Sequence, residues 1–313
     1  MREPETPKIL VIKLSALGDF VLSIGAFQAI RAHHRDARIT LLTTKPFVRL
    51  AEACGCFDEI WIDDRPAWWQ AGRWRGFARR LKAAGFDRVY DLQRSGRSGW
   101  YFRLAGRPRP EWVGSVPGCS HRYVDPPEPR HIAERNARML ALAGIEAVAL
   151  PDLSFLTADV GRFGIARPYA LLAPGSSPHR PAKRWPATRY AALARHLADR
   201  GITPVLLGTR AEGPILAEIA GHCPQARDLC GRTGLDDLAG LARGAALAVG
   251  NDTGPMHLIA AAGCRCLVLY SAASDPVKAA PRGPRVSILR EASLKDLALK
   301  RVLEALEPLP QIR

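Results

Sequence analysis

The sequence predicts an α/β protein made of two doubly wound parallel sheets, one in each half of the chain. Short apolar runs alternate with longer stretches of helical periodicity, a pattern typical of strands that helices cover on both faces. Polar turns containing Gly or Pro follow several of these runs and lead directly into a helix. The length of 313 residues is sufficient for two domains, each with a sizeable core. Strands that alternate with helices in this way form parallel sheets.

The first half, residues 1–155, is expected to form one Rossmann-like domain. Ile9–Ile12 is a continuous apolar run, Ser15–Gly18 forms a turn, and helical periodicity begins at Val21. The Pro-rich stretch 106–130 is interpreted as a long surface loop. Strands are expected near residues 9–13, 38–43, 59–62 and 88–92.

The second half, residues 156–313, is expected to form a second domain of the same kind. A mixture of Pro, Gly and charged residues near 152–168 indicates a linker between the halves. A final helix is expected near 293–307. Strands are expected near residues 169–173, 203–207, 246–249 and 266–270.

The segment 245–263 is the most informative part of the sequence. It reads as a buried strand, a polar turn and an apolar helix, with Pro255 at the first helical position. A helix that starts at a strand end presents free N–H groups and a positive dipole end, which suits a phosphate. A solvated turn capped by Asp252 or Thr253 would give the same pattern. The polar side chains at this helix start are Asn251, Asp252, Thr253 and His257.

Two other segments repeat the order of strand, turn and helix. The segment 8–31 places Asp19 beyond the end of the first strand, where open α/β sheets bind ligands, and its alternative role is a helix cap. In the segment 169–197, Lys183 lies in the loop; it suits a diphosphate, although alone it would be a solvated charge. The hydroxyls in the same loop belong to Ser176 and Ser177.

Four motifs occur in order along the chain: Lys13-Leu-Ser-Ala-Leu-Gly-Asp19, Pro174-Gly-Ser-Ser with Ala182-Lys-Arg-Trp-Pro186, Gly208-Thr-Arg-Ala-Glu212, and Asn251-Asp-Thr-Gly-Pro-Met-His257. Together they resemble glycosyltransferase family 9, the ADP-heptose:lipopolysaccharide heptosyltransferases. The resemblance covers nearly the whole chain. It implies a GT-B fold, in which two Rossmann-like domains face each other across a cleft. Residues 1–155 would bind the acceptor and residues 156–313 the nucleotide sugar, with the final helix packing back on the hinge.

The resemblance also implies an inverting heptosyl transfer from ADP-heptose that needs no metal and no cofactor. The sequence contains no Asp-x-Asp motif, whose carboxylates would suit a metal. In this family's pattern Asp19 would be the general base, Glu212 would lie near the nucleotide ribose, and Asp252 near the heptose hydroxyls, with His257 one helical turn beyond. The other donor-binding residues would be Ser176, Ser177, Lys183, Thr253 and Gly254, and the acceptor-binding residues Arg94 and Arg97.

The net charge of +15 indicates an anionic partner. Arginines gather in the first half with tryptophans near them, a combination that suits nucleic acid, an anionic membrane surface or a phosphorylated glycolipid. A solvated surface in an Arg-rich protein is the simplest alternative. No nucleic-acid-binding motif with a defined spacing occurs, and in the family the first half faces the acceptor. We therefore expect an anionic glycolipid acceptor and no nucleic acid.

Polar residues at 1–7 and the lack of any apolar stretch of membrane-spanning length predict a cytoplasmic protein, peripheral at the inner membrane. The seven cysteines form no zinc-ribbon pattern and are expected to be reduced thiols. Two other functions remain open: transfer from another nucleotide sugar, and a non-catalytic module that binds a nucleotide sugar or nucleic acid. Asp19 favours an enzyme, because a pure binder needs no carboxylate beside the donor.

Overall fold

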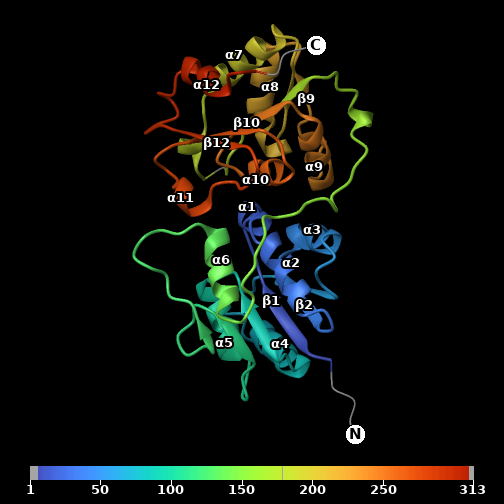
Figure 1. Ribbon diagram of the computed structural model, residues 1–313, viewed down its shortest axis with the longest axis vertical. Coiled ribbons are helices and arrows are strands. Elements are labelled where there is room, and N and C mark those ends of the chain that lie inside the picture. The colour runs from blue at the N-terminus through green and yellow to red at the C-terminus, as the bar shows by residue number, and fades with distance from the viewer. Residues whose placement is uncertain (1–5, 178, 310–313) are drawn as a thin grey trace. The chain divides into compact units, whose positions relative to one another are not determined.

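The computed structural model describes residues 6–177 and 179–309. The chain divides into two compact units, Met1–Pro151 and Asp152–Arg313. Each unit contains a six-stranded sheet whose described strand pairs are all parallel, with helices packed on it (Figure 1). This architecture confirms the predicted class of two doubly wound parallel sheets.

The first sheet has the strand order β3-β2-β1-β4-β5-β6. Its strands are β1 Lys8–Ile12, β2 Arg38–Thr43, β3 Glu59–Ile62, β4 Arg88–Asp91, β5 Glu111–Gly114 and β6 His121–Arg122. The α-helices of this unit are α1 Leu17–Val21, α2 Ile24–His33, α3 Val48–Ala53, α4 Ala71–Ala84, α5 Gly96–Leu104 and α6 Ile132–Ala141.

Strand β1 lies inside the first sheet and is buried on both faces. Leu10 and Ile12 pack on one face with Leu81 of α4 and with Tyr101 and Phe102 of α5. The alternate residues of β1 point to the other face and are equally buried. Burial on both faces explains why the run is continuously apolar rather than alternating.

The second sheet has the strand order β12-β11-β10-β7-β8-β9. Its strands are β7 Tyr169–Ala173, β8 Thr203–Leu206, β9 Arg227–Asp228, β10 Leu247–Asn251, β11 Cys266–Tyr270 and β12 Val286–Arg290. The α-helices of this unit are α7 Ala187–Ala198, α8 Gly213–His222, α9 Leu235–Gly244, α10 Gly254–Ala261, α11 Pro276–Ala279 and α12 Leu299–Leu306.

One face of the second sheet is covered by α7, α8 and α12, which share a single apolar core with it. Tyr190 of α7, Leu216 of α8 and Val302 of α12 belong to this core, together with Leu172 of β7 and Val249 of β10. The last helix is therefore part of the second unit's own core. Its packing back on the hinge stays a prediction.

Both sheets have the same connectivity. Read from its other edge, the second order is β9-β8-β7-β10-β11-β12, which matches β3-β2-β1-β4-β5-β6 strand for strand. In such sheets ligands bind beyond the carboxyl ends of the strands, where the strand order reverses. The reversal lies between β1 and β4 in the first unit, and between β7 and β10 in the second. Loops that follow these four strands are the places to look for a site.

The prediction of a long surface loop over residues 106–130 is wrong in part, because this stretch contains β5 and β6. Both strands are short; Pro110 directly precedes β5, and Pro117 interrupts the local pattern between β5 and β6. Pairing with β4 and with each other supplies the order that local propensity lacks. The edge strands β9 and β12 were likewise not expected.

The expected linker near 152–168 is packed on the second unit. Leu153, Leu156 and Phe163 are buried, and Arg243 of α9 donates hydrogen bonds to the carbonyls of Leu153 and Leu156. The composition resembles that of a linker, but its spaced apolar residues are anchored in the core. The final helix is also shorter than the expected 293–307, since α12 begins only at Leu299. Leu294 and Leu297, which contributed to the apolar pattern, are buried in the core but precede the helix.

The residues just before the boundary are fixed to the first unit. Gly25 of α2 lies against the backbone of the segment 149–150, and a Cβ at Gly25 would come within 2.2 Å of the carbonyl oxygen of Ala149. Glycine at this position therefore lets the end of the first unit lie directly on α2. Among the described residues, no helix is long and apolar enough to cross a membrane.

Candidate active site

Lys183 and Asp252 form an ion pair at the point where the strand order of the second sheet reverses. Lys183 ends a short 3-10 turn, Pro181–Lys183, in the loop after β7, and Asp252 directly follows β10. Only 12% of the Lys183 side chain and 13% of the Asp252 side chain are exposed. Lys183 is thus a largely buried cation held by Asp252, and the interpretation of a solvated loop charge is wrong.

The first turn of α10 is not capped by a side chain. Thr253 is the N-cap residue, with extended backbone angles, and its side chain makes no capping hydrogen bond in the described part of the chain. Asp252 binds Lys183 instead of the helix. Gly254 is the first helical residue and Pro255 the second, so Pro255 lies one position later than expected. The interpretation of an ordinary side-chain cap at Asp252 or Thr253 is therefore wrong.

Two further groups lie near this helix start. His257 is buried within α10. Burial and the neighbouring Asp252 raise the pKa of Tyr270, the last residue of β11, so its hydroxyl stays protonated at neutral pH. Asp252 therefore lies between a cation and a neutral hydroxyl group.

Asn251, the fully buried last residue of β10, holds the loop after β7 in place. Its Nδ2 donates hydrogen bonds to the carbonyl oxygens of Pro174, at 2.6 Å, and Gly175, at 3.3 Å. Its Oδ1 accepts from the backbone N–H of Trp185 at 3.2 Å and from the hydroxyl of Tyr190 at 3.1 Å. The full bonding capacity of one amide is used to join β10 to both ends of this loop.

Ser176 is buried and bound within its own loop, whereas Ser177 is exposed. The Oγ of Ser176 accepts from Nε of Arg184 at 3.0 Å, and the Ser176 carbonyl accepts from the Arg184 guanidinium at 3.1 Å. Ser176 Oγ also donates to the carbonyl oxygen of Arg180 at 3.2 Å. The loop after β7 thus contains a second ordered cation, Arg184, which was not predicted as a site residue.

Glu212 lies against the same loop. It ends the 3-10 turn Arg210–Glu212, and its carboxylate accepts hydrogen bonds from the N–H of Thr209 at 2.8 Å and from its hydroxyl at 3.0 Å. A Cβ built on Gly175 would lie 1.5 Å from Oε1 of Glu212, so only glycine fits beside this carboxylate. Three of the four sequence motifs therefore meet at one edge of the second sheet.

In the first unit, Asp19 is the third residue of α1 and is partly buried. The N-cap of α1 is Ala16, so Asp19 is not a helix cap. Burial lowers the pKa of Lys13 from 10.5 to about 8, and the carboxylate of Asp19 opposes this change. Burial also lowers the pKa of Arg135 of α6, which Asp19 again opposes. Asp19 therefore lies in a cationic environment beyond the end of β1.

The loops after β1 and β4 are bound to each other where the first strand order reverses. Oε1 of Gln93 accepts hydrogen bonds from the N–H of Leu14, at 2.8 Å, and Ser15, at 3.2 Å. Nζ of Lys13 donates to the carbonyl oxygen of Leu92 at 3.3 Å. The loop that carries Asp19 is thus held by side chains on both sides of the reversal.

Arg94 and Arg97 follow β4 as predicted, and both have partners within the first unit. Arg94 forms an ion pair with Asp125, and its side chain is only 11% exposed. Arg97 lies 3.6 Å from a carboxylate oxygen of Asp63 and donates a hydrogen bond to the carbonyl oxygen of Pro66 at 3.1 Å. Contact of either arginine with an acceptor stays a prediction.

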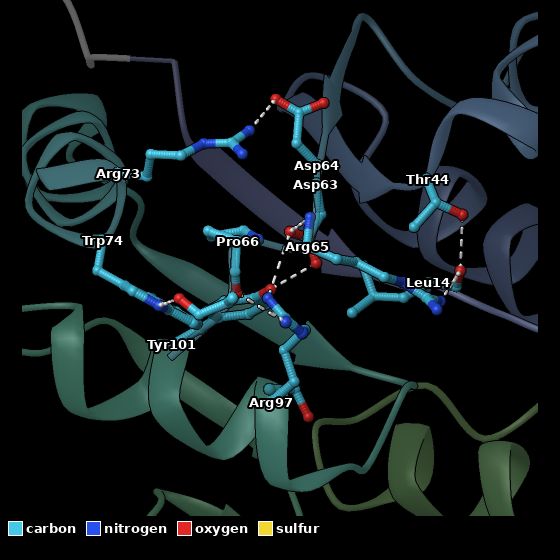
Figure 2. A network of polar contacts seen from close by, with 12 residues as sticks. Leu14, Thr44, Asp63, Asp64, Arg65, Pro66, Arg73, Trp74, Arg97 and Tyr101 are labelled. Carbon is cyan, nitrogen blue, oxygen red and sulfur yellow. Dashed lines mark hydrogen bonds and ion pairs between the residues drawn. The ribbon is translucent and has the colours of Figure 1, made fainter. Parts of the chain in front are cut away.

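Asp63 organises the loop after β3 (Figure 2). Its Oδ2 accepts a hydrogen bond from the hydroxyl of Tyr101 at 2.6 Å, and its Oδ1 accepts from the N–H of Arg65 at 2.8 Å. The Arg65 guanidinium donates to the carbonyl oxygen of Leu14 at 3.1 Å, so this network reaches the loop after β1. Arg97 lies in the same network, which gives it a positioning role beside its predicted one.

The residues that were not predicted are mainly those that hold the loops: Gln93, Arg184 and the amide of Asn251. Asn251 was recognised as a polar group at a helix start but not as a structural bridge. Its position in the sequence could have indicated this role, because Asn251 is the first polar residue after the apolar part of β10, a strand beside the point where the strand order reverses. The described residues contain no group of three or more His, Cys, Asp or Glu side chains suited to a metal ion.

Two Rossmann-like units in one chain, each with charged loops at its own strand-order reversal, define a protein of the GT-B fold class. The family model of glycosyltransferase family 9 (heptosyltransferase) matches residues 74–307 of this chain. The chain belongs to this family and is a glycosyltransferase.

Individual proteins of the family are similar to this chain over nearly its whole length. The chain is 28% identical to lipopolysaccharide heptosyltransferase 2 of Escherichia coli, with 96% of this chain and 98% of the relative covered. The solved structure of E. coli ADP-heptose LPS heptosyltransferase II is similar with a TM-score of 0.78 at 26% identity, covering 96% of this chain and 98% of that one. E. coli heptosyltransferase WaaC with ADP shares the fold, with a TM-score of 0.76 at 21% identity and coverage of 97% and 100%.

Proposed function

We propose that this glycosyltransferase transfers a heptose from ADP-heptose to a sugar of the lipopolysaccharide inner core, with inversion at the anomeric carbon and without a metal. The relatives support the substrate class, because the curated E. coli protein is named a lipopolysaccharide heptosyltransferase and the solved one is named for ADP-heptose. In this proposal, the first unit binds the acceptor and the second binds the nucleotide sugar.

The ion pair of Lys183 with Asp252 beside the uncapped start of α10 carries the proposal. An amine and a helix N-terminus are a favourable pair of partners for a diphosphate. When ADP-heptose binds, Lys183 exchanges Asp252 for the diphosphate, and Asp252 accepts hydrogen bonds from the sugar hydroxyls. Ser177, Thr253, Gly254 and Glu212 complete the donor site, with Ser176 and His257 supporting it from buried positions.

The chemistry is a single displacement. The acceptor hydroxyl oxygen attacks the anomeric carbon as the bond from that carbon to the β-phosphate oxygen breaks. The hydroxyl proton passes to the carboxylate of Asp19, and ADP leaves with the bonding electron pair. Lys183 and the N–H groups of α10 stabilise the charge that develops on ADP, the task that a metal performs in other transferases.

The acceptor in this proposal is an anionic glycolipid, which fits the net charge of +15. The protein would work in the cytoplasm at the face of the inner membrane, and nucleic acid would not be its partner. Arg94 and Arg97 are the proposed acceptor contacts. Each would have to exchange an intramolecular carboxylate for the acceptor, Asp125 in the case of Arg94 and Asp63 in the case of Arg97.

A donor screen tests the proposal. The purified protein is mixed with a Kdo-containing lipid acceptor and with ADP-heptose or other ADP-, UDP- or GDP-sugars, and the products are analysed by mass spectrometry. We expect ADP release and addition of one heptosyl residue to the acceptor with ADP-heptose alone. Turnover only with a UDP- or GDP-sugar would identify a different transferase. Donor binding without release of the nucleotide would identify a binding module.

A further inference from the structure

Three tryptophans are exposed on the surface of the first unit. Trp68 is 84% exposed, Trp69 68% and Trp100 55%. Trp68 and Trp69 precede α4, and Trp100 lies on α5. Large aromatic side chains contribute so much apolar area that an exposed group of them marks an interaction surface.

Two of these tryptophans line an apolar groove along α4 and α5, which pack against each other. The groove has a volume of about 370 Å³, and its walls are almost entirely carbon. Hereafter we call it the tryptophan groove. It is lined by Trp68, Ala71, Trp74, Arg75, Ala78, Trp100 and Leu104.

The two helices that form the tryptophan groove carry charge of one sign. Neither α4 nor α5 contains an acidic residue. Arg75, Arg79 and Arg103 are exposed, and none of them forms an ion pair within the described ranges 6–177 and 179–309. The Arg103 guanidinium lies 4.9 Å from the centre of the Trp100 ring, so a cation and an exposed indole are presented together.

We infer that the tryptophan groove and the three surrounding arginines dock the protein on an anionic phospholipid bilayer. Indole rings favour the interface between headgroups and acyl chains, where their apolar body is buried and their N–H remains hydrated. Unpaired arginines are attracted to the negative surface potential of anionic lipids. An apolar groove matches the upper acyl region better than it matches nucleic acid, whose bases also offer polar edges. The inference rests on the proposed function, since a lipid-anchored acceptor requires an enzyme that works at the bilayer.

Vesicle flotation with the full chain tests this inference without donor or acceptor. The probes are vesicles of phosphatidylcholine alone and of phosphatidylcholine mixed with phosphatidylglycerol, at low and at high salt. We expect the protein to float with the mixed vesicles at low salt only. Tryptophan emission should shift to the blue on binding, and lipids brominated on the upper acyl chain should quench it.

Two double variants separate the parts of the surface. Arg75→Gln with Arg79→Gln should weaken partitioning to the anionic vesicles roughly 10- to 30-fold, because each basic residue near such a surface adds to the attraction. Trp68→Ala with Trp100→Ala should weaken it roughly tenfold and abolish the quenching by brominated lipid. The matched charge control is Arg35→Gln with Arg138→Gln, which removes the same charge elsewhere on the first unit. The matched apolar control is Val277→Ala on the second unit.

The outcomes are distinct from those of the donor screen. Binding lost in both groove variants but kept in both controls supports the inference, and circular dichroism confirms that the variants are folded. Equal loss in the controls would overturn it, because attraction would then depend on net charge alone. Flotation only when the acceptor glycolipid is present, or oligonucleotide binding that the groove variants abolish while vesicles do not bind, would also overturn it. Vesicle binding with no heptosyl transfer would refute the proposed function and leave the docking surface standing.

Discussion

The Asp19 carboxylate is the group on which the proposed proton transfer depends. It lies beyond the end of β1, it does not cap its helix, and buried or half-buried cations surround it. The ionised carboxylate can accept a proton, which is what a general base requires.

We expect Asp19→Asn to reduce the rate of transfer by about 10²- to 10⁴-fold, because the amide cannot accept the acceptor proton. Its affinity for ADP should stay within a few-fold of that of the wild type. The measurements are single-turnover kinetics and calorimetry with ADP, and Glu52→Gln on α3 is the control for loss of an exposed carboxylate. Near-normal turnover by Asp19→Asn would show that another group is the base.

Lys183→Ala should weaken ADP binding roughly 10- to 100-fold, the usual loss for one charge-assisted contact to phosphate. The same variant leaves the Asp252 carboxylate without its cation beside a buried Tyr270. Part of the loss of ADP binding therefore arises from this unpaired carboxylate and not from the missing contact to phosphate. Calorimetry of Lys183→Ala, Asp252→Asn and the double variant separates the two effects. Lys278→Ala, on an exposed residue of the second unit, should bind ADP normally.

The arginines after β4 provide the opposite pattern. Arg94→Ala should leave ADP affinity unchanged and raise the acceptor KM. If instead Arg94→Ala lost ADP binding and Lys183→Ala kept it, the assignment of donor and acceptor to the two units would be reversed.

Buried Lys13 gives the first unit a defined pH dependence. Its folded-state pKa of about 8 lies below the 10.5 of an exposed lysine, so the unfolded chain binds more protons between these two values. The wild type should therefore gain stability relative to Lys13→Met as the pH rises through this window, by up to about 3 kcal/mol. Urea unfolding at several pH values measures this difference, with exposed Lys45→Met as the control. A difference that does not vary with pH would contradict it.

At the scale of single residues, the sequence indicates charged candidates in turns more readily than the groups that hold those turns in place. Lys183 and Asp252 stand out because each lies in a strand-to-helix turn within one of the four motifs. Arg97 stands out equally by sequence, yet it is engaged by Asp63, a contact that depends on two loops far apart in the chain. Such partners follow from the tertiary fold and have no local pattern.

Among the elements of the second unit, β10 and the loop after β7 are joined through one side chain, Asn251. Asn251 alone makes four hydrogen bonds to this loop and to α7. Asn251→Ala should lower the free energy of unfolding by roughly 3 kcal/mol, because it leaves buried polar groups unpaired. Asn251→Asp should also destabilise the protein, because a carboxylate cannot donate to the two carbonyls. Chemical denaturation measures both, and wild-type stability in Asn251→Ala would refute this account.

The elements also show why prediction was uneven. Strands β1, β7 and β10 are buried on both faces, so their apolar runs are continuous and easily recognised. Strands β5, β6 and β9 have two to four residues and draw their order from neighbouring strands. Short α1 is separated from α2 by a break at Leu22 and Ser23, where periodicity alone indicated one continuous helix.

For the molecule as a whole, we expect transfer to be independent of metal. The fixed N–H groups at the start of α10 and the Lys183 amine are positioned for the charge of a leaving diphosphate. Activity with a detergent-dispersed acceptor should survive EDTA, with at most a modest stimulation by Mg²⁺ through screening of the anionic lipid. Loss of nearly all turnover in EDTA, restored by stoichiometric Mg²⁺ or Mn²⁺ at constant ionic strength, would contradict this mechanism.

The close approach of Gly25 to Ala149 has a practical consequence for dividing the chain. Residues 149–150 lie on α2, and Leu153 is already buried in the core of the second unit. Only the few residues between them can be cut without removing a packed residue from one of the two units. A gene split between Pro151 and Asp152 would leave each polypeptide with a complete sheet and an unbroken core. A split a few residues to either side would strip one half of an anchoring contact. The two halves could then be expressed separately, mixed, and tested for restored transfer. The contact of Gly25 with Ala149 thus indicates where to divide the chain.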